Sequence, residues 1–174
     1  MSSRAVAIGA ALALAACRAQ PSEPQFPNAH RPVAPIVGDT FSTEDARDRL
    51  SDRVQRENLD NVAVKLGAPD NPMLPQSSFD RVFLVHMYHE VESPYAFLWH
   101  LRDGVKPDGF VIVVDSNRPV SHHGIPPAQL KCEFAALGLQ PVKFSMLTGG
   151  DAYYAAFRAV GPRPAPPQIK ACQS

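Results

Sequence analysis

The sequence has no surplus of either charge and no hydrophobic run long enough to cross a membrane as a helix. Lysine plus arginine number 17, as do aspartate plus glutamate, so the formal net charge is +0. A balanced chain gives no reason to expect nucleic acid or an anionic membrane surface as its partner. The chain has 174 residues, of which 45% are hydrophobic. This length and composition are typical of one globular domain.

The N-terminus has the pattern of a lipoprotein signal peptide. Arg4 precedes an uncharged run, AVAIGAALALAA over residues 5–16. A membrane-spanning helix needs roughly 20 residues, so this run suits the hydrophobic region of a signal peptide instead. Leu14-Ala15-Ala16-Cys17 then resembles a lipobox, whose cysteine is lipidated and becomes the new N-terminus; the alternative is an ordinary secretory signal cut nearby. We expect a signal peptide over residues 1–16, lipidation of Cys17, and an exported protein anchored in a membrane on the periplasmic side.

Proline-rich segments flank the periodic part of the sequence. Residues 17–40 are expected to form an extended tether, residues 41–158 the folded domain, and residues 159–174 a flexible tail. In an exported protein Cys132 and Cys172 meet an oxidising compartment and can pair. The alternative is a buried Cys132 on a helix and a free Cys172 in a mobile tail, and the sequence leaves this choice open.

Helical and extended patterns alternate along the domain, which predicts an α/β fold with a mostly parallel sheet. A charged helix starts at Ser42 or Thr43 and ends before Asn58. Continuous apolar runs predict strands that are buried on both faces. The remaining elements are a strand over 62–66, a strand over 80–86, a helix over 94–101, a turn over 106–109, a strand over 110–115, a helix over 127–137 and two final strands over 140–145 and 152–158.

Three parts of this pattern resemble the class I S-adenosylmethionine methyltransferases. FDRVFLVHMYHEVESP (79–94) resembles the family's fourth-strand motif, and LRDGVKPDGFVIVVD (101–115) resembles its helix–turn–strand signature. The final two strands resemble its closing antiparallel hairpin. Asp108 stands where the family usually has glycine, but Asp-Gly still suits a turn. The likeness covers residues 59–158 and implies a Rossmann-like sheet and S-adenosylmethionine as the cofactor.

Two elements of that family are missing from this sequence. The family's first strand ends in a glycine-rich loop that approaches the cofactor, and its second ends in an acidic residue that holds the ribose. Before residue 67 the sequence has only Gly9 and Gly38. Two family-like segments look fused at Arg47-Asp48-Arg49-Leu50, so our hypothesis is that a stretch carrying the first two strands has been lost. Strand 80–86 would then expose an apolar edge prone to self-association, unless strand 62–66 docks there.

The resemblance implies a cofactor site at the carboxyl ends of the strands. Ala68 and Pro69 correspond to the loop that touches the adenine ring, and His86, Met87 and Tyr88 would line the cofactor cleft. The candidate catalytic bases are His86 and His89. The alternatives are a plain solvent turn over 67–70, and packing or hydrogen bonding of His86 and Tyr88 against the next helix.

A metal site at the same edge is a second interpretation, but it has no sequence signature. Six side chains could converge there, yet their spacing is not a known metal motif, so no metal is assigned: His86, His89, Glu90, Asp115, His122 and His123. We therefore expect a methyltransferase-like protein with an unknown methyl acceptor, and leave catalysis open. The alternative is a non-catalytic, lipid-tethered interaction module or the remnant of a methyltransferase.

Overall fold

The computed structural model describes residues 23–27, 30–32 and 43–173 and has the predicted α/β architecture. Its helices are α1 (Thr43–Arg56), α2 (Pro94–Gly104) and α3 (Pro127–Ala136). Its strands are β1 (Phe79–Val85), β2 (Val105–Ser116), β3 (Leu139–Met146) and β4 (Ala152–Ala159). Three short 3-10 helices complete it: η1 (Tyr88–Glu90), η2 (Val120–His122) and η3 (Pro166–Gln168).

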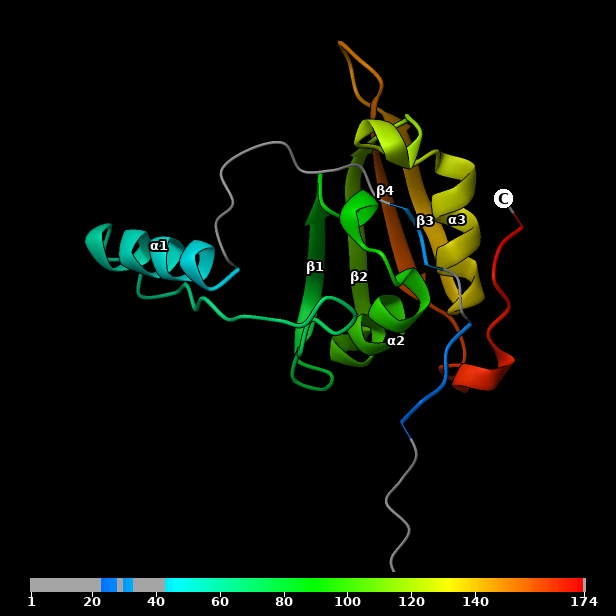
Figure 1. The fold of residues 1–174 in the computed structure, drawn as a ribbon, viewed down its shortest axis with the longest axis horizontal. Coiled ribbons are helices and arrows are strands. Elements are labelled where there is room, and N and C mark those ends of the chain that lie inside the picture. Colours follow the sequence, from blue (N-terminus) through cyan, green and yellow to red (C-terminus); the bar gives the residue numbers. More distant parts are fainter. Residues whose placement is uncertain (1–22, 28–29, 33–42, 174) are drawn as a thin grey trace, which may run out of the picture.

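The four strands form one mixed sheet in the order β1-β2-β4-β3. β1 runs parallel to β2, whereas β4 runs antiparallel to both β2 and β3. Helices α2 and α3 lie in front of this sheet (Figure 1). The arrangement confirms the predicted partial Rossmann-like sheet with a closing antiparallel hairpin. In the described part of the chain β1 pairs only with β2, so β1 is an edge strand.

The core lies between the sheet and these two helices. Apolar side chains from both layers are fully buried there: Leu98, Leu101, Val111, Val113, Leu130, Phe134 and Phe157. The ring of Phe134 lies 5.2 Å from that of Tyr88 and 4.1 Å from that of Phe157. Burying such a side chain stabilises the fold by about 1.5–3 kcal/mol. This packing fixes the carboxyl ends of β1 and β2, where the candidate site residues lie.

The predicted strand over 62–66 is wrong. These residues form no strand, and Val62 and Leu66 remain 43% and 37% exposed. An extended segment becomes a strand only when its backbone groups find partners on a neighbouring strand. Residues 62–66 have no such ladder, so they do not dock on β1 and its outer edge stays unpaired among the described residues.

The predicted turn over 106–109 is also wrong, because these residues lie inside β2. β2 advances from Val105 to Phe110 while β1 advances only from Phe79 to Arg81, so the extra residues bulge out of the ladder. A Cβ on Gly109 would lie 2.9 Å from the carbonyl oxygen of Phe79. The turn-forming residues therefore produce a bulge within a continuous strand, and glycine is required where the two backbones approach.

The C-terminal tail, expected to be flexible, packs on the domain. Ile169 is buried in the core, and the indole Nε1 of Trp99 donates to the carbonyl oxygen of Pro164 at 3.0 Å. A disulfide joins Cys172 to Cys132, with 6.1 Å between their Cα atoms. Cys132 is therefore an exposed, paired residue of α3 and not a buried core thiol, which settles the choice that the sequence left open.

Part of the predicted tether also contacts the domain. The backbone N–H of Arg31 donates to the carbonyl oxygen of Glu92 at 2.9 Å. The side chain of Arg31 is buried against Glu133. The ring of Phe26 lies 5.6 Å from that of Trp99. The rest of the tether, the signal peptide and Cys17 lie outside the described residues.

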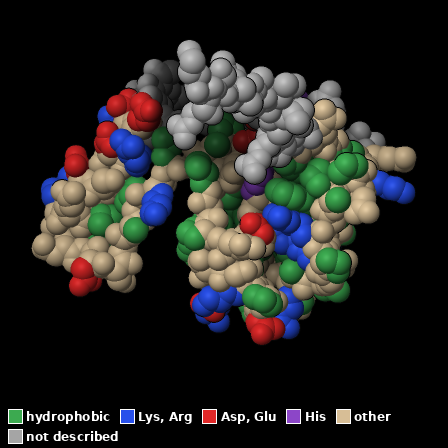
Figure 2. Space-filling model, turned by 90° about the horizontal axis from the view of Figure 1, so that it is seen from below, with side chains coloured by type: hydrophobic (Ala, Val, Ile, Leu, Met, Phe, Trp, Pro, Cys, Tyr) green, Lys and Arg blue, Asp and Glu red, His purple; other side chains and the backbone are tan. Residues whose placement is uncertain are grey.

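Helix α1 stands apart from the sheet (Figure 1). Leu50, one of the few apolar residues of this charged helix, is 50% exposed. Seen from below, a gap separates the lobe that holds α1 from the sheet domain, and this lobe carries side chains of both charges (Figure 2). Within the described ranges, no helix is long and apolar enough to cross a membrane.

Candidate functional site

A groove of about 680 Å³ lies beside the outer edge of β1. Its walls come from residues 65–74, from β1, from α2 and from Glu44 of α1. Three of the five side chains predicted to bind the cofactor line this groove: Ala68, Pro69 and Met87. The volume is within the range of small-molecule sites, and most of the lining is apolar.

Ala68 and Pro69 belong to a tight turn. The backbone N–H of Ala68 donates to the carbonyl oxygen of Asn71 at 2.7 Å, and the N–H of Asn71 donates to the carbonyl oxygen of Ala68 at 3.1 Å. Proline suits the second position of such a turn because its φ is preset. The segment is thus an exposed turn, as one interpretation of the sequence expected, and it also forms one wall of the groove.

His86 and Tyr88 do not line the groove. His86 is exposed and its backbone has a φ of +48°. The backbone N–H of His86 donates to the carbonyl oxygen of Val114 at 2.8 Å. Tyr88 is fully buried and its hydroxyl donates to Glu133 Oε2 on α3 at 2.7 Å. Burial and the neighbouring Glu133 carboxylate raise the pKa of the Tyr88 hydroxyl well above its ordinary value. Tyr88 therefore bonds α3, whereas the alternative allowed by the sequence named the next helix along the chain, which is α2.

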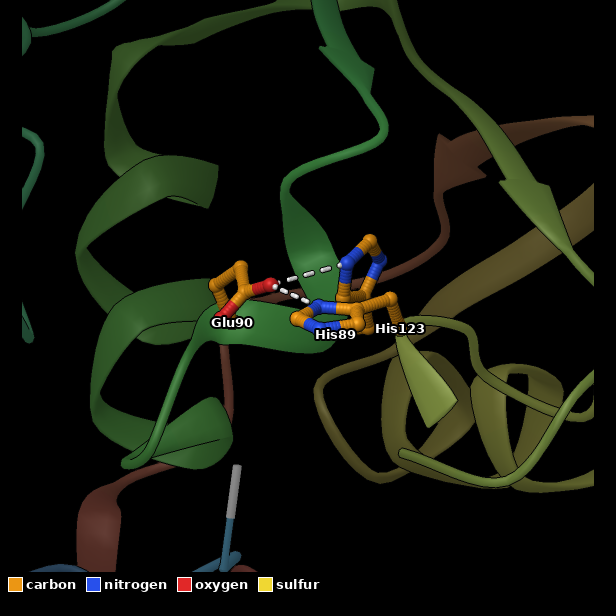
Figure 3. Close-up of side chains that lie close together, drawn as sticks. All are labelled: His89, Glu90 and His123. Carbon is orange, nitrogen blue, oxygen red and sulfur yellow. Dashed lines mark hydrogen bonds and ion pairs between the residues drawn. The ribbon is translucent and has the colours of Figure 1, made fainter. Parts of the chain in front are cut away.

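A second cluster forms where the chain leaves β1 and β2. His89 Nδ1 lies 2.9 Å from Asp115 Oδ1, and His89 Nε2 lies 3.0 Å from Glu90 Oε1. The same Glu90 oxygen lies 3.0 Å from His123 Nδ1 (Figure 3). Asp115 is fully buried and also accepts the N–H of Ser116 at 2.8 Å. Both ring nitrogens of His89, one of the two candidate bases, are thus engaged by carboxylates.

Two of the six residues considered for a metal stay outside this cluster. His86 is not part of it, and His122 Nδ1 contacts Ser121 Oγ at 3.1 Å. The sequence placed Asp115 at the end of its strand, but it did not predict the contact between the Asp115 carboxylate and His89 Nδ1. The available signal was a single acidic residue ending an otherwise apolar strand.

The groove fits only part of the predicted cofactor. Its apolar wall suits an adenine ring, but a glycine-rich backbone loop that could approach the amino-acid part is not among its described residues. Gly67 is the one glycine in this lining, and a Cβ there would lie 3.1 Å from the backbone of Pro72 in its own segment. Gly67 therefore serves the local packing of the turn and not the approach of a ligand.

Comparison with known proteins identifies the fold. A family model described as a methyltransferase domain matches residues 29–113. A solved S-adenosylmethionine-dependent methyltransferase from Aquifex aeolicus is 19% identical with a TM-score of 0.61, over 67% of this chain and 65% of that one. The domain has the fold of a class I methyltransferase.

Other proteins with this fold are still more distant in sequence. The [4+2]-cyclase SpnF is 14% identical with a TM-score of 0.57, over 68% of this chain and 64% of its own. The PH0226 protein from Pyrococcus horikoshii OT3 is 14% identical with a TM-score of 0.52, over 68% of this chain and 66% of that one. The chain thus spans no more than two thirds of the length of these proteins. A search of the curated proteins finds no match.

Proposed function

We propose that this chain is a methyltransferase-like protein that receives the adenosine part of S-adenosylmethionine weakly in the groove beside β1 and does not transfer the methyl group. The proposal rests on one observation. The groove keeps the turn with Ala68 and Pro69, and Met87, while the outer edge of β1 has no neighbouring strand in the described part of the chain. In the family that the sequence resembles, the first strand provides the glycine-rich loop.

The chemistry explains why that loop matters. Methyl transfer needs little acid–base assistance, so catalysis depends on holding the methyl group and the acceptor in line. Backbone N–H groups at a helix N-terminus are a strong anchor for a charged ligand. Apolar contacts to the adenosine part leave the methyl-bearing end free to move, which removes the positioning on which the rate depends.

Methionine methyl NMR tests where the cofactor binds. The chain has four methionines, of which Met87 lines the groove and Met146 ends β3 at the opposite edge of the sheet. With millimolar S-adenosylmethionine added to the full-length chain, the Met87 methyl resonance should shift and that of Met146 should stay in place. An unmoved Met87 signal, or equal shifts at both positions, would place any binding elsewhere.

A second function, that of a non-catalytic interaction module, is supported by the outer edge of β1. Phe83 and Val85 are 59% and 54% exposed beside backbone groups that β2 does not pair. Edge strands of this kind readily add a strand from another chain or from a second copy. Such a module would use the same edge that the cofactor-binding strand occupies in the family.

We further propose that the protein is exported and anchored in a membrane through a lipid on Cys17. The support in the sequence is the signal-like run before Leu14-Ala15-Ala16-Cys17. Independent support comes from the disulfide between Cys132 and Cys172, because such bonds persist mainly in oxidising compartments.

A further inference from the structure

We propose that His89, Glu90 and His123 bind one Zn²⁺ ion at the carboxyl ends of β1 and β2. The three ligand atoms are His89 Nε2, Glu90 Oε1 and His123 Nδ1, and all lie within 4.8 Å of one another. The rings of His89, on η1, and His123, directly after η2, both approach the same carboxylate oxygen of Glu90 (Figure 3). This inference does not depend on the proposed function, because it uses no residue of the groove.

The side chains around His89 suit a cation, either a second proton on the ring or a metal ion. Asp115 is an acceptor 2.9 Å from Nδ1, so Nδ1 must carry the proton. In the neutral ring, Nε2 then has a lone pair, yet Nε2 faces the Glu90 carboxylate at 3.0 Å. Two acceptors at this distance repel each other unless a proton or a metal ion lies between them. His123 Nδ1, 3.0 Å from the same oxygen, provides a third donor atom for a metal.

Asp115 has the position of an outer partner in a metal site. A histidine that binds a metal usually gives its second ring N–H to a carboxylate, which fixes the tautomer and the ring orientation. Asp115 does this for His89 and is itself held by the N–H of Ser116. The side chain of His89 is 5% exposed and that of Asp115 is 0% exposed, so this half of the site is rigid.

The set of ligand atoms suits a transition metal that binds nitrogen, and the ion that we propose is Zn²⁺. Two imidazole nitrogens and one carboxylate oxygen form the ligand set of zinc sites that keep a fourth position open, whereas Mg²⁺ and Ca²⁺ prefer oxygen alone. The side chains of Glu90 and His123 are 27% and 52% exposed, so water can reach the fourth position. Water or an anionic oxygen of a ligand is the expected fourth donor.

Zinc titration of the full-length chain tests the site. The chain is stripped with EDTA and titrated with Zn²⁺ in competition with a coloured chelator. We expect one ion per chain, with X-ray absorption showing imidazole nitrogen and oxygen ligands. His123→Ala, at an exposed position that should not affect folding, should lower the zinc affinity at least about 100-fold, and Asp115→Asn about 10- to 100-fold.

His122→Ala is the matched control, since His122 is the neighbouring exposed histidine and contacts Ser121 instead. Its zinc affinity should equal that of the unchanged chain. The proposal is wrong if His123→Ala binds zinc as tightly as the unchanged chain, or if NMR of the metal-free and zinc-treated chain shows the same doubly protonated His89. If Asp115→Asn fails to fold, His123→Ala decides the question alone.

Discussion

Replacing Cys172 with alanine should lower the free energy of unfolding by about 4 kcal/mol. The disulfide to Cys132 joins residues separated by 40 positions, and in the chain-entropy model closing a loop of that length restricts the unfolded chain by about this amount. The bond also holds the tail in place, where the N–H of Cys172 donates to the Tyr95 hydroxyl at 2.7 Å. Urea unfolding followed by circular dichroism measures the loss.

The matched comparison uses a reductant. Cys132→Ala should lose the same stability as Cys172→Ala, because each removes the same covalent bond. A reductant should destabilise the unchanged chain to the level of the two variants and leave the variants themselves unaffected. If the unchanged chain is as stable with the reductant as without it, the disulfide does not contribute to the fold as described.

Replacing Cys17 with alanine should abolish lipid attachment completely. Only a cysteine thiol at this position can receive the lipid in the lipobox interpretation, so the effect is all or none. Cells that express the full-length chain are grown with a clickable fatty-acid analogue, and the label on the purified chain is measured. Cys172→Ala, which also removes one cysteine, should keep its label. Equal labelling of the Cys17→Ala variant and the unchanged chain would rule out the anchor.

The sequence predicts most of the sheet because the strands in question carry strong local signals. The apolar runs within β1 and β2 and the alternation in β3 and β4 place three of the four strands within one residue of their observed bounds, whereas β2 begins five residues earlier than predicted. Residues 62–66 look similar locally but have no partner strand. Residues 106–109 have the composition of a turn, yet pairing with β1 keeps them in β2. In both cases a tertiary contact decided the outcome.

The candidate site was predictable only in part, for related reasons. Ala68, Pro69 and Met87 meet in one groove, as the family resemblance implied. A polar residue after a strand does not reveal which way its side chain turns, so Tyr88 in the core and His89 on Asp115 could not be told apart from the sequence. The contact of His123 with Glu90 joins residues 33 positions apart, and no local spacing encodes it.

The shared fold by itself does not establish methyl transfer. One protein of similar fold is a [4+2]-cyclase, which shows that this architecture can serve different reactions. Function therefore has to be argued from the groove beside the outer edge of β1 and from the histidine cluster where the chain leaves β1 and β2. The groove lacks a cofactor anchor among its described residues, whereas the cluster brings three possible ligand atoms together beside a buried carboxylate.

The most direct test of this account is a calorimetric titration of the full-length chain with S-adenosylmethionine and with S-adenosylhomocysteine. With only the apolar groove and its turn available, we expect dissociation constants no tighter than millimolar, equivalent to about 4 kcal/mol of binding free energy. Micromolar binding of either compound would contradict the account, because it would require another backbone segment to hold the amino-acid part of the cofactor.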